Sequence, residues 1–233
     1  MTMRAMRVLL CCGLLGLLSG CATSVHPLCD PAMAEPDKRL VGMWVEHDDK
    51  VQTNIVTYVH FAREPQKPLD KNREVPEPGL MRCWTIDHDA HTSVGGQFSG
   101  GRFFCTRIGN SNYSSLVLAE VLASVDDSQR TSFEQSLARF ADVPGYSFVK
   151  YEVSDDQLVI WPTVQDQVAK SIVDKEIAGI AKKRKVAPGD LPFPEWEQVE
   201  LTASTEELRA FIAAGRAEKW FSDDLKTVLR RLR

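Results

Sequence analysis

Residues 40–47 read LVGMWVEH, and residues 54–61 read NIVTYVHF. Both stretches are rich in β-branched and aromatic residues, which are enriched in strands, and their apolar positions recur mainly with period two. Asp48, Asp49 and Lys50 lie between them and are typical of a turn. We therefore expect two strands joined by a turn, and the rest of the fold is built outward from this pair.

The same period continues along the chain. Further strands are expected over 81–87, 102–108, 113–122, 146–153, 157–161, 199–202 and 225–232. Helical spacing is expected over 126–141, over 164–185, and from Ser204 to a stop at Gly215. The pattern predicts a single α+β domain with a curved or barrel-like, mainly antiparallel sheet of seven or eight strands and two or three appended helices.

The first twenty residues have the organisation of an export signal. Arg4 and Arg7 precede an apolar run that is too short to span a bilayer, and small residues follow it. The run ends in Leu18-Ser19-Gly20-Cys21, which resembles the lipobox of bacterial lipoproteins.

The lipobox resemblance implies that a diacylglycerol is attached to the Cys21 thiol, that the chain is cleaved before Cys21, and that the freed amine is acylated. Two or three acyl chains hold a protein durably at a membrane, whereas one holds it only marginally. Ala22, in place of the aspartate that retains such proteins in the inner membrane, implies an outer-membrane location facing the periplasm.

The domain organisation follows from this processing. Residues 1–20 would be removed, 21–37 would form a lipidated N-terminus and tether, and 38–233 would form one globular domain. Pro27, Pro31 and Pro36 lie among small and polar residues, a composition typical of a flexible linker. The remaining chain is long enough for one well-buried core.

Charge excludes one class of function. Loss of the signal removes two arginines and no acid, which changes the formal net charge from −4 to −6. Proteins that bind nucleic acid draw their affinity from lysine and arginine at phosphates, so an acidic chain is a poor candidate. The expected partners are the membrane, through the N-terminal anchor, and proteins of the cell envelope.

Three cysteines would remain after Cys21 is modified. Cys83 and Cys105 both lie in expected strands, and an exported compartment preserves disulfides. A Cys83–Cys105 bridge is one expectation, with Cys29 free or taking part instead. Buried, unpaired thiols are the alternative.

Gly42-Met43-Trp44 resembles the Gly-x-Trp opening of the lipocalins, in which the tryptophan closes one end of an eight-stranded barrel. The resemblance implies that Gly42 permits a tight turn and that Trp44 packs under a late arginine, Arg230. The alternative is an ordinary core aromatic. A carrier of this kind would hold a small apolar molecule inside the sheet. Six aromatic residues are candidates to line that cavity: Trp44, Tyr58, Phe61, Trp84, Phe104 and Trp161.

Two polar runs carry weaker signals. His88 and His91 are close enough in sequence to share a zinc ion, but the same residues are typical of a polar hairpin tip. The basic run at 182–185 could contact anionic headgroups, or it could complement the dipole at the C-terminal end of the expected helix.

Sequence motifs do not point to catalysis. The chain has no Gly-x-Ser-x-Gly elbow, no phosphate-binding loop and no dinucleotide fingerprint, and no cofactor is expected. The sequence therefore predicts an anchored, non-enzymatic interaction or structural module. A lipocalin-like carrier is the first alternative and a metal-dependent envelope enzyme is the second.

Overall fold

The structure is a computed structural model that describes residues 22–46, 55–63, 79–89, 97–117, 145–184 and 195–232. Its strands are β1 (Thr23–Ser24), β2 (Gly42–Glu46), β3 (Ile55–Arg63), β4 (Leu80–Asp89), β5 (Gln97–Ile108), β6 (Ser111–Val117), β7 (Tyr146–Val153), β8 (Gln157–Pro162), β9 (Gly179–Lys183), β10 (Trp196–Leu201) and β11 (Thr227–Arg231). The helices in the described part are α5 (Gln165–Val173) and α6 (Thr205–Ala213), and the short 3₁₀ turns are η1 (Pro31–Met33), η3 (Glu218–Trp220) and η4 (Asp223–Leu225).

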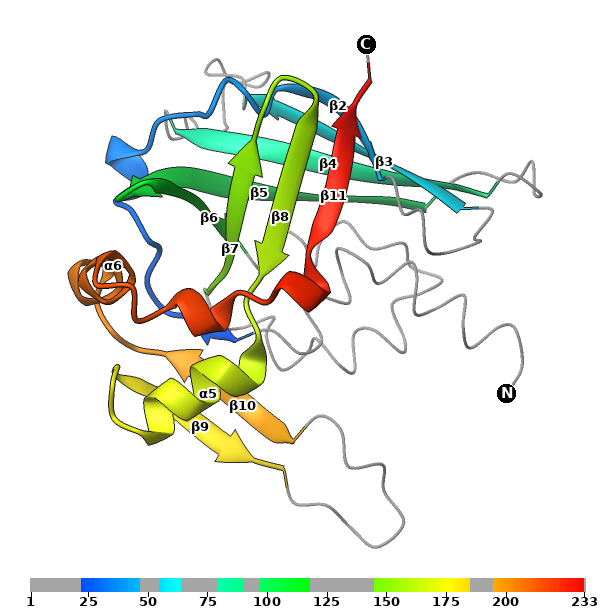
Figure 1. The fold of residues 1–233 in the computed structure, drawn as a ribbon. Helices are drawn as coiled ribbons and strands as arrows, with labels where there is room; N and C mark the ends of the chain where they lie inside the picture. Colours follow the sequence, from blue (N-terminus) through cyan, green and yellow to red (C-terminus); the bar gives the residue numbers. More distant parts are fainter. Residues whose placement is uncertain are drawn as a thin grey trace, which may run out of the picture.

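Eight of these strands close into an antiparallel barrel (Figure 1). Within the barrel, strands β2 to β8 pair with one another in chain order, and β11 lies between β8 and β2. The β6–β7 pair, which runs from Asn112↔Tyr151 to Val117↔Tyr146, completes the ring. A barrel removes free sheet edges, which are otherwise prone to pair with other chains.

Three further strands extend the sheet outside the barrel. β1 pairs with the start of β7 and in parallel with β10, and β10 pairs with β9. These strands, together with α5 and α6, are contributed mainly by the long connection between β8 and β11. In Figure 1 the β9–β10 pair lies at one end of the molecule and the C-terminus at the other.

The expected barrel-like, mainly antiparallel sheet is confirmed, and the expected strands correspond to β2–β8, β10 and β11. The α+β class fits loosely, because strands dominate the described residues. The expected helix over 126–141 lies outside those residues. The expected helix over 164–185 is wrong: α5 ends at Val173, and the chain turns through Lys175 at a φ of +59° into β9.

The final helix forms where the sequence predicts it. The Ser204 side chain accepts a hydrogen bond from the Glu207 backbone N–H, and the Glu207 carboxylate accepts one from the Ser204 N–H. This reciprocal capping box satisfies two otherwise unpaired donors. Gly215, at a φ of +73°, follows the helix in a conformation that favours glycine.

The barrel interior is packed at the end that carries Trp44. Side chains alternate between the two faces of each strand, so residues of one parity face inward. The inward group forms a core with the following buried members: Leu40, Trp44, Val59, Phe61, Met81, Cys83, Phe103, Cys105, Tyr151, Leu158 and Leu229. Burial of such aliphatic and aromatic side chains contributes about 1.5–3 kcal/mol each.

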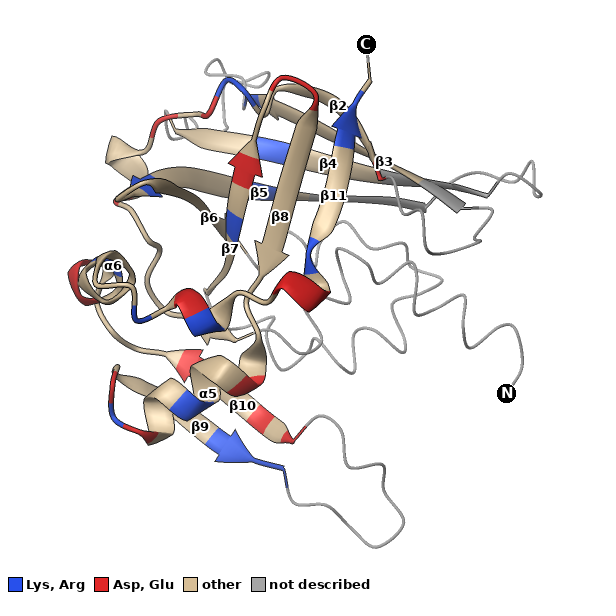
Figure 2. Cartoon of the chain, viewed as in Figure 1, with Lys and Arg blue, Asp and Glu red and all other residues tan. Residues whose placement is uncertain are grey.

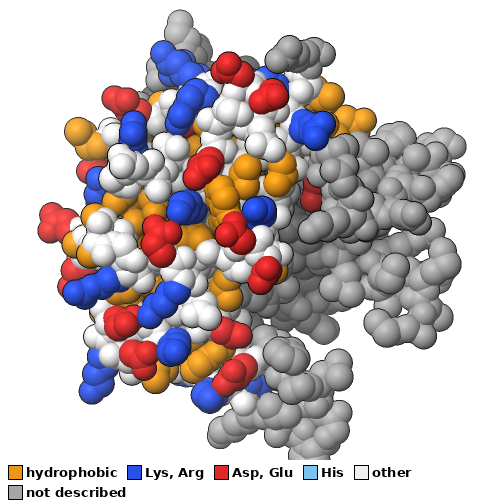
Figure 3. Space-filling model, viewed as in Figure 1, with side chains coloured by type: hydrophobic (Ala, Val, Ile, Leu, Met, Phe, Trp, Pro, Cys, Tyr) orange, Lys and Arg blue, Asp and Glu red, His pale blue; other side chains and the backbone are white. Residues whose placement is uncertain are grey.

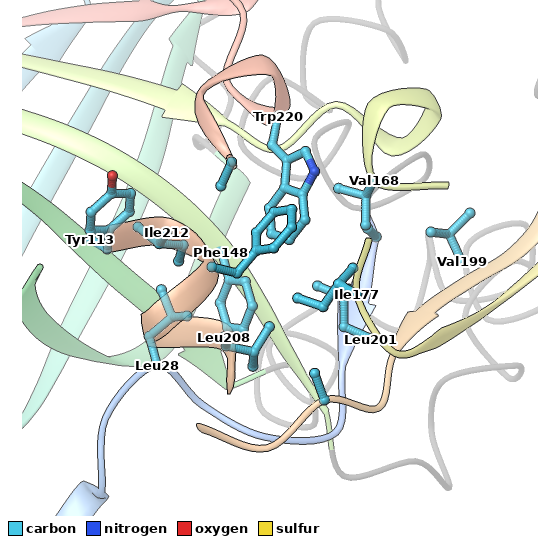
Figure 4. Packing of buried hydrophobic residues seen from close by; sticks show 14 of the residues in the cluster. Leu28, Tyr113, Phe148, Val168, Ile177, Val199, Leu201, Leu208, Ile212 and Trp220 are labelled. Atoms are coloured by element: carbon cyan, nitrogen blue, oxygen red, sulfur yellow. The ribbon is translucent and has the colours of Figure 1, made fainter. Parts of the chain in front are cut away.

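A second core joins the outer surface of the barrel to the added elements (Figure 4). Trp220 is fully buried, stacks on Phe211 with ring centroids 5.0 Å apart, and donates a hydrogen bond from Nε1 to Ser171 Oγ at 3.0 Å. Phe148, on the outer face of β7, belongs to the same cluster. The added strands and helices are therefore packed onto the barrel and form one structure with it.

The expected tether is the largest error of the sequence analysis, because residues 22–37 belong to the fold. Ala22 and Leu28 are buried in the second core. The Leu28 N–H donates to Ser115 Oγ at 3.0 Å, and Arg209 of α6 donates to the Leu28 carbonyl at 3.0 Å. Cys29 and Ala34 pack against Leu80 and Phe104 on the outside of the barrel.

Candidate functional site

Trp44 closes one end of the barrel beneath an arginine of the last strand. Its indole is fully buried and donates from Nε1 to the Leu40 carbonyl at 2.8 Å. Arg231 lies opposite Trp44 in the β11–β2 pair, and its guanidinium carbon is 4.2 Å from the centre of the Trp44 ring. This geometry gives a cation–π contact, which is strongest over tryptophan.

Arg231 also ties three chain segments together. Its guanidinium donates to the carbonyls of Val41 at 3.0 Å, Asp155 at 2.8 Å and Arg39. Gly42 lies directly below at a φ of +132°, and a Cβ there would approach Arg231 Nη1 to 3.2 Å. The site therefore requires glycine both for its backbone conformation and for space.

The expectation that Arg230 covers Trp44 is wrong by one residue. In β11, Leu229 and Arg231 face inward, whereas Arg230 is exposed on the outer face. A shift of one position along a strand moves a side chain to the opposite face, so the choice between adjacent arginines decides which one reaches the tryptophan.

The opposite end of the interior is lined differently. The register places seven side chains on the inward face there: Glu46, Thr57, Thr85, Leu116, Ser147, Ile160 and Thr227. Most of them are small or polar: Thr85 and Ser147 are buried, Thr57, Leu116, Ile160 and Thr227 keep partial exposure, and Glu46 is exposed. Leu116 and Ile160 pack against the Trp44 core, so the accessible positions begin at its edge.

Only two of the six aromatic residues expected to line a cavity face the interior. Trp44 and Phe61 do so, at the packed end. Tyr58 and Trp84 lie on the outer face, where Trp84 stacks on His60 with ring centroids 5.4 Å apart. The expectation is therefore wrong for Tyr58 and Trp84, and it is wrong for the remaining two side chains as well. Phe104 packs outside the barrel under the N-terminal segment, and Trp161 donates to Asp223 Oδ1 at 3.0 Å.

A polar group borders the packed end. Tyr151 donates to Asp37 Oδ2 at 3.0 Å, and Arg39 pairs with the same carboxylate at 2.6 Å. Burial acts to raise the pKa of Asp37, but these hydrogen bonds outweigh it and hold the pKa below its ordinary value. Burial raises the pKa of Tyr151. A hollow of ≈ 560 Å³ lies beside the group, against the N-terminal segment and Arg209.

The expected Cys83–Cys105 disulfide is wrong. Cys83 is paired with Gly101 in the β4–β5 ladder, which is four residues from Cys105 along β5. Four residues of strand span about 13 Å, well beyond the reach of a disulfide. None of Cys29, Cys83 and Cys105 is in a disulfide and all three are buried, and burial raises the pKa of Cys83 and of Cys105 to about 11 each. These thiols are therefore protonated and poor nucleophiles.

Other expected site residues fall partly outside the described chain. Leu18, Ser19, Gly20, Cys21 and His91 lie there, and the backbone of His88 belongs to β4. Within the described ranges, no group of three or more histidine, cysteine or acidic side chains is placed to hold a metal ion. Among those same residues, no helix has the length and apolarity needed to cross a bilayer.

The charged surface does not single out a site. Over β7, β8, β11 and α6, basic and acidic side chains alternate, with hydrophobic side chains between them (Figures 2 and 3). A second hollow of ≈ 690 Å³ lies between the end of α5, β9 and α6, and Lys175, Glu176, Glu207 and Arg216 contribute charges of both signs to it.

Two functional features escaped the sequence analysis. Arg231 could have been found by assigning the inward parity of β11 from Leu229, its buried neighbour two residues away. The Asp37–Tyr151 contact joins residues 114 positions apart, and no local pattern marks it. The chain matches no family model, and no curated protein and no solved structure is significantly similar to it.

Proposed function

We propose that this chain is an envelope lipoprotein whose barrel binds a small amphipathic ligand in the half of the interior opposite Trp44. The observation that supports this proposal best is the arrangement of Gly42, Trp44 and Arg231 at one end of a closed eight-stranded antiparallel barrel. This is the arrangement that the lipocalin resemblance of residues 42–44 implies, with Arg231 in the place expected for Arg230.

The contrast along the barrel supports a binding role. One end is packed with large side chains and provides the rigid support that a preformed site needs. The other end carries inward threonines, of which Thr57 and Thr227 keep partial exposure. Binding sites are usually concave and largely preformed, with an apolar lining and a few placed polar groups.

The lining indicates the chemistry of the ligand. Leu116 and Ile160 offer apolar contact, and the hydroxyls of Thr57, Thr85 and Thr227 can form hydrogen bonds. Glu46 adds a carboxylate on the same inward face. A molecule with an apolar body and a neutral or cationic polar end fits this combination.

Titration with N-phenyl-1-naphthylamine, a neutral dye that fluoresces in apolar surroundings, tests the site. We expect saturable binding to the processed chain. Ile160→Trp places a large side chain in the interior and should abolish binding. Val159→Trp makes the same change at the adjacent, outward position of β8 and should leave binding intact.

Circular dichroism and thermal unfolding show whether each variant folds. Thr227 lies opposite Ile160 in the β8–β11 pair. If Ile160→Trp fails to fold, Thr227→Phe places a smaller obstruction in the same part of the interior. Saturable binding that Ile160→Trp and Thr227→Phe leave unchanged would contradict a site inside the barrel, as would the absence of saturable binding by the wild type.

Membrane anchoring through Cys21 is the second part of the proposal. It is supported by the export signal and by the resemblance of residues 18–21 to the lipobox. Mass spectrometry of the chain extracted from membranes should show an acylated N-terminal Cys21, and Cys21→Ser should release the chain from the membrane fraction. An unmodified Cys21, or a leader that is still attached, would contradict anchoring.

One surface favours an interaction module as a second candidate function. His60, Trp84 and Met43 form a row across the outer faces of β2, β3 and β4, and Met43 is 44% exposed. Aromatic residues and methionine are enriched at protein interfaces. A photo-crosslinking amino acid at Met43 should capture an envelope protein that the same group at Arg230 does not capture. Equal capture, or none, would count against this role.

A further inference from the structure

The chain leaves no slack between Cys21 and the folded body. β1 begins two residues after Cys21 and is held on both sides, by Tyr146 of β7 and by residues 200 and 201 of β10. Ala22 is buried, and Thr23 donates from Oγ1 to the Val199 carbonyl at 3.3 Å. Consecutive Cα atoms are 3.8 Å apart across a trans peptide, so the attachment point cannot be farther than that from Ala22.

β1 enters the fold where the extension joins the barrel, between β7 and β10. Thr23 pairs with Glu200, and Glu200 pairs with Ile180 of β9. Figure 1 places the β9–β10 pair at one end of the molecule, and β11 ends beside the C-terminus at the opposite end. Arg231, over Trp44, belongs to that opposite end.

We infer that the membrane surface is the partner of the β9–β10 end of the molecule, and that the Trp44 end of the barrel points away from the bilayer. This inference rests on the proposed acylation of Cys21. An acyl group fixed within one residue of the fold constrains orientation, whereas a tether as long as the one expected from the sequence would let the body turn freely.

The orientation of the molecule on the membrane is set by the short link between Cys21 and β1, and not by attraction between surface charges and lipid headgroups. Lys182 and Lys183 are the last residues of β9 and Arg184 follows them, so these charges do not lie at a helix terminus; Lys185 lies outside the described residues. Lys183 pairs with Glu195 at 2.7 Å, and Glu197 and Glu200 add two more acids on the neighbouring strand. Because these charges balance, attraction to anionic headgroups is weak, and added salt should not change the orientation.

Site-directed fluorescence quenching in vesicles tests the inference. The acylated chain, extracted from membranes, is reconstituted into phosphatidylethanolamine–phosphatidylglycerol vesicles that contain a headgroup-nitroxide lipid. A maleimide fluorophore is placed at Lys182→Cys, Met33→Cys or Leu232→Cys, one position in each protein. The three remaining native thiols are buried, whereas Met33 and Leu232 are exposed. Met33 borders the hollow beside Asp37 and Tyr151, and Leu232 directly follows β11.

We expect the label at position 182 to lose most of its fluorescence and the labels at 33 and 232 to lose little, at low and at raised salt. A Gly/Ser segment of about 15 residues inserted between Cys21 and Ala22 reaches about 20 Å and should equalise the three positions while the chain stays bound. Equal quenching in the bound native-length chain would overturn the orientation and leave anchoring intact. Failure to bind vesicles would refute anchoring, and the orientation with it.

Discussion

The two ends of the barrel differ in what fills them. At one end, Trp44, Leu158 and Leu229 are fully buried, and Arg231 closes the assembly with a cation–π contact and three hydrogen bonds to carbonyls. At the other end, Thr57 and Thr227 face inward and remain partly exposed. The same eight strands form both ends, so backbone pairing alone does not decide how completely the inward side chains are buried.

Position along the barrel decides it instead. In β8, Leu158 is fully buried, and Ile160, a side chain of the same size two positions along the same face, is only partly buried and packs against the edge of the Trp44 core. We therefore expect substitutions at the Trp44 end to cost stability, and substitutions at the opposite end to change ligand binding with little cost in stability.

The largest effect is expected from Trp44→Ala. Removal of a fully buried tryptophan leaves a cavity and should lower the free energy of unfolding by about 3–5 kcal/mol. Trp161→Ala is the matched control, because Trp161 lies on the outer face and should cost about 1 kcal/mol. Urea denaturation of both variants measures the difference, and equal losses would contradict the assignment of the two faces.

Arg231→Met comes next. It removes the cation–π contact and the charged donor to three carbonyls and should lower the free energy of unfolding by about 1.5–3 kcal/mol. Arg230→Met changes the exposed neighbour and should stay within about 0.5 kcal/mol of the wild type. If Arg230→Met lowers the free energy of unfolding more than Arg231→Met does in the same denaturation experiment, the sequence-based expectation that Arg230 covers Trp44 would be supported instead.

Comparison of Gly42→Ala with Gly109→Ala separates the cost of a strained backbone from the cost of crowding against Arg231. The new Cβ meets Arg231 Nη1 at 3.2 Å in a conformation unsuited to L-residues, so we expect a loss of about 1–3 kcal/mol. Gly109, at a φ of +60°, has no atom within 4 Å of an added Cβ. Gly109→Ala should therefore show only the backbone cost of about 1 kcal/mol, and thermal unfolding compares the two.

The smallest effect is a pH dependence at the rim of the Trp44 end. The pKa of Asp37 is lower in the folded chain than in the unfolded chain, so its stabilising effect is present above the unfolded value and is lost as pH falls through the folded value. In Asp37→Asn, the free energy of unfolding should fall less steeply than in the wild type as the pH is lowered into the acid range. Asp224→Asn, at an exposed position, should show the same acid dependence as the wild type.

The sheet could be predicted because strand composition and period-two patterning are local, even though β5 and β6 each bury three successive residues, 103–105 and 113–115. The helix expected over 164–185 failed because its apolar residues also suit a short helix followed by a strand, and the turn at Lys175 carries no glycine. The tether failed because prolines and small residues are typical of linkers, yet β1 is held by strands that come about 120 and 180 residues later.

The candidate site was predictable in part. Residues 42–44 located the closed end, and only the parity of β11 was needed to choose Arg231. The cavity lining was predicted poorly, because aromatic content does not reveal which face of a strand is inward. Trp84 and Trp161 face outward, while threonines and a serine, which attract no attention in a sequence, take inward positions away from Trp44.

In the proposed carrier, the end of the interior opposite Trp44 binds the ligand while the Trp44 end stays a closed core. Methyl NMR of the processed chain during titration with N-phenyl-1-naphthylamine reports on both ends at once. We predict saturable shifts for the methyl groups of Leu116 and Ile160, with those of Leu158 and Leu229 unmoved. Shifts confined to Leu158 and Leu229, or no shift in any of the four, would contradict the account.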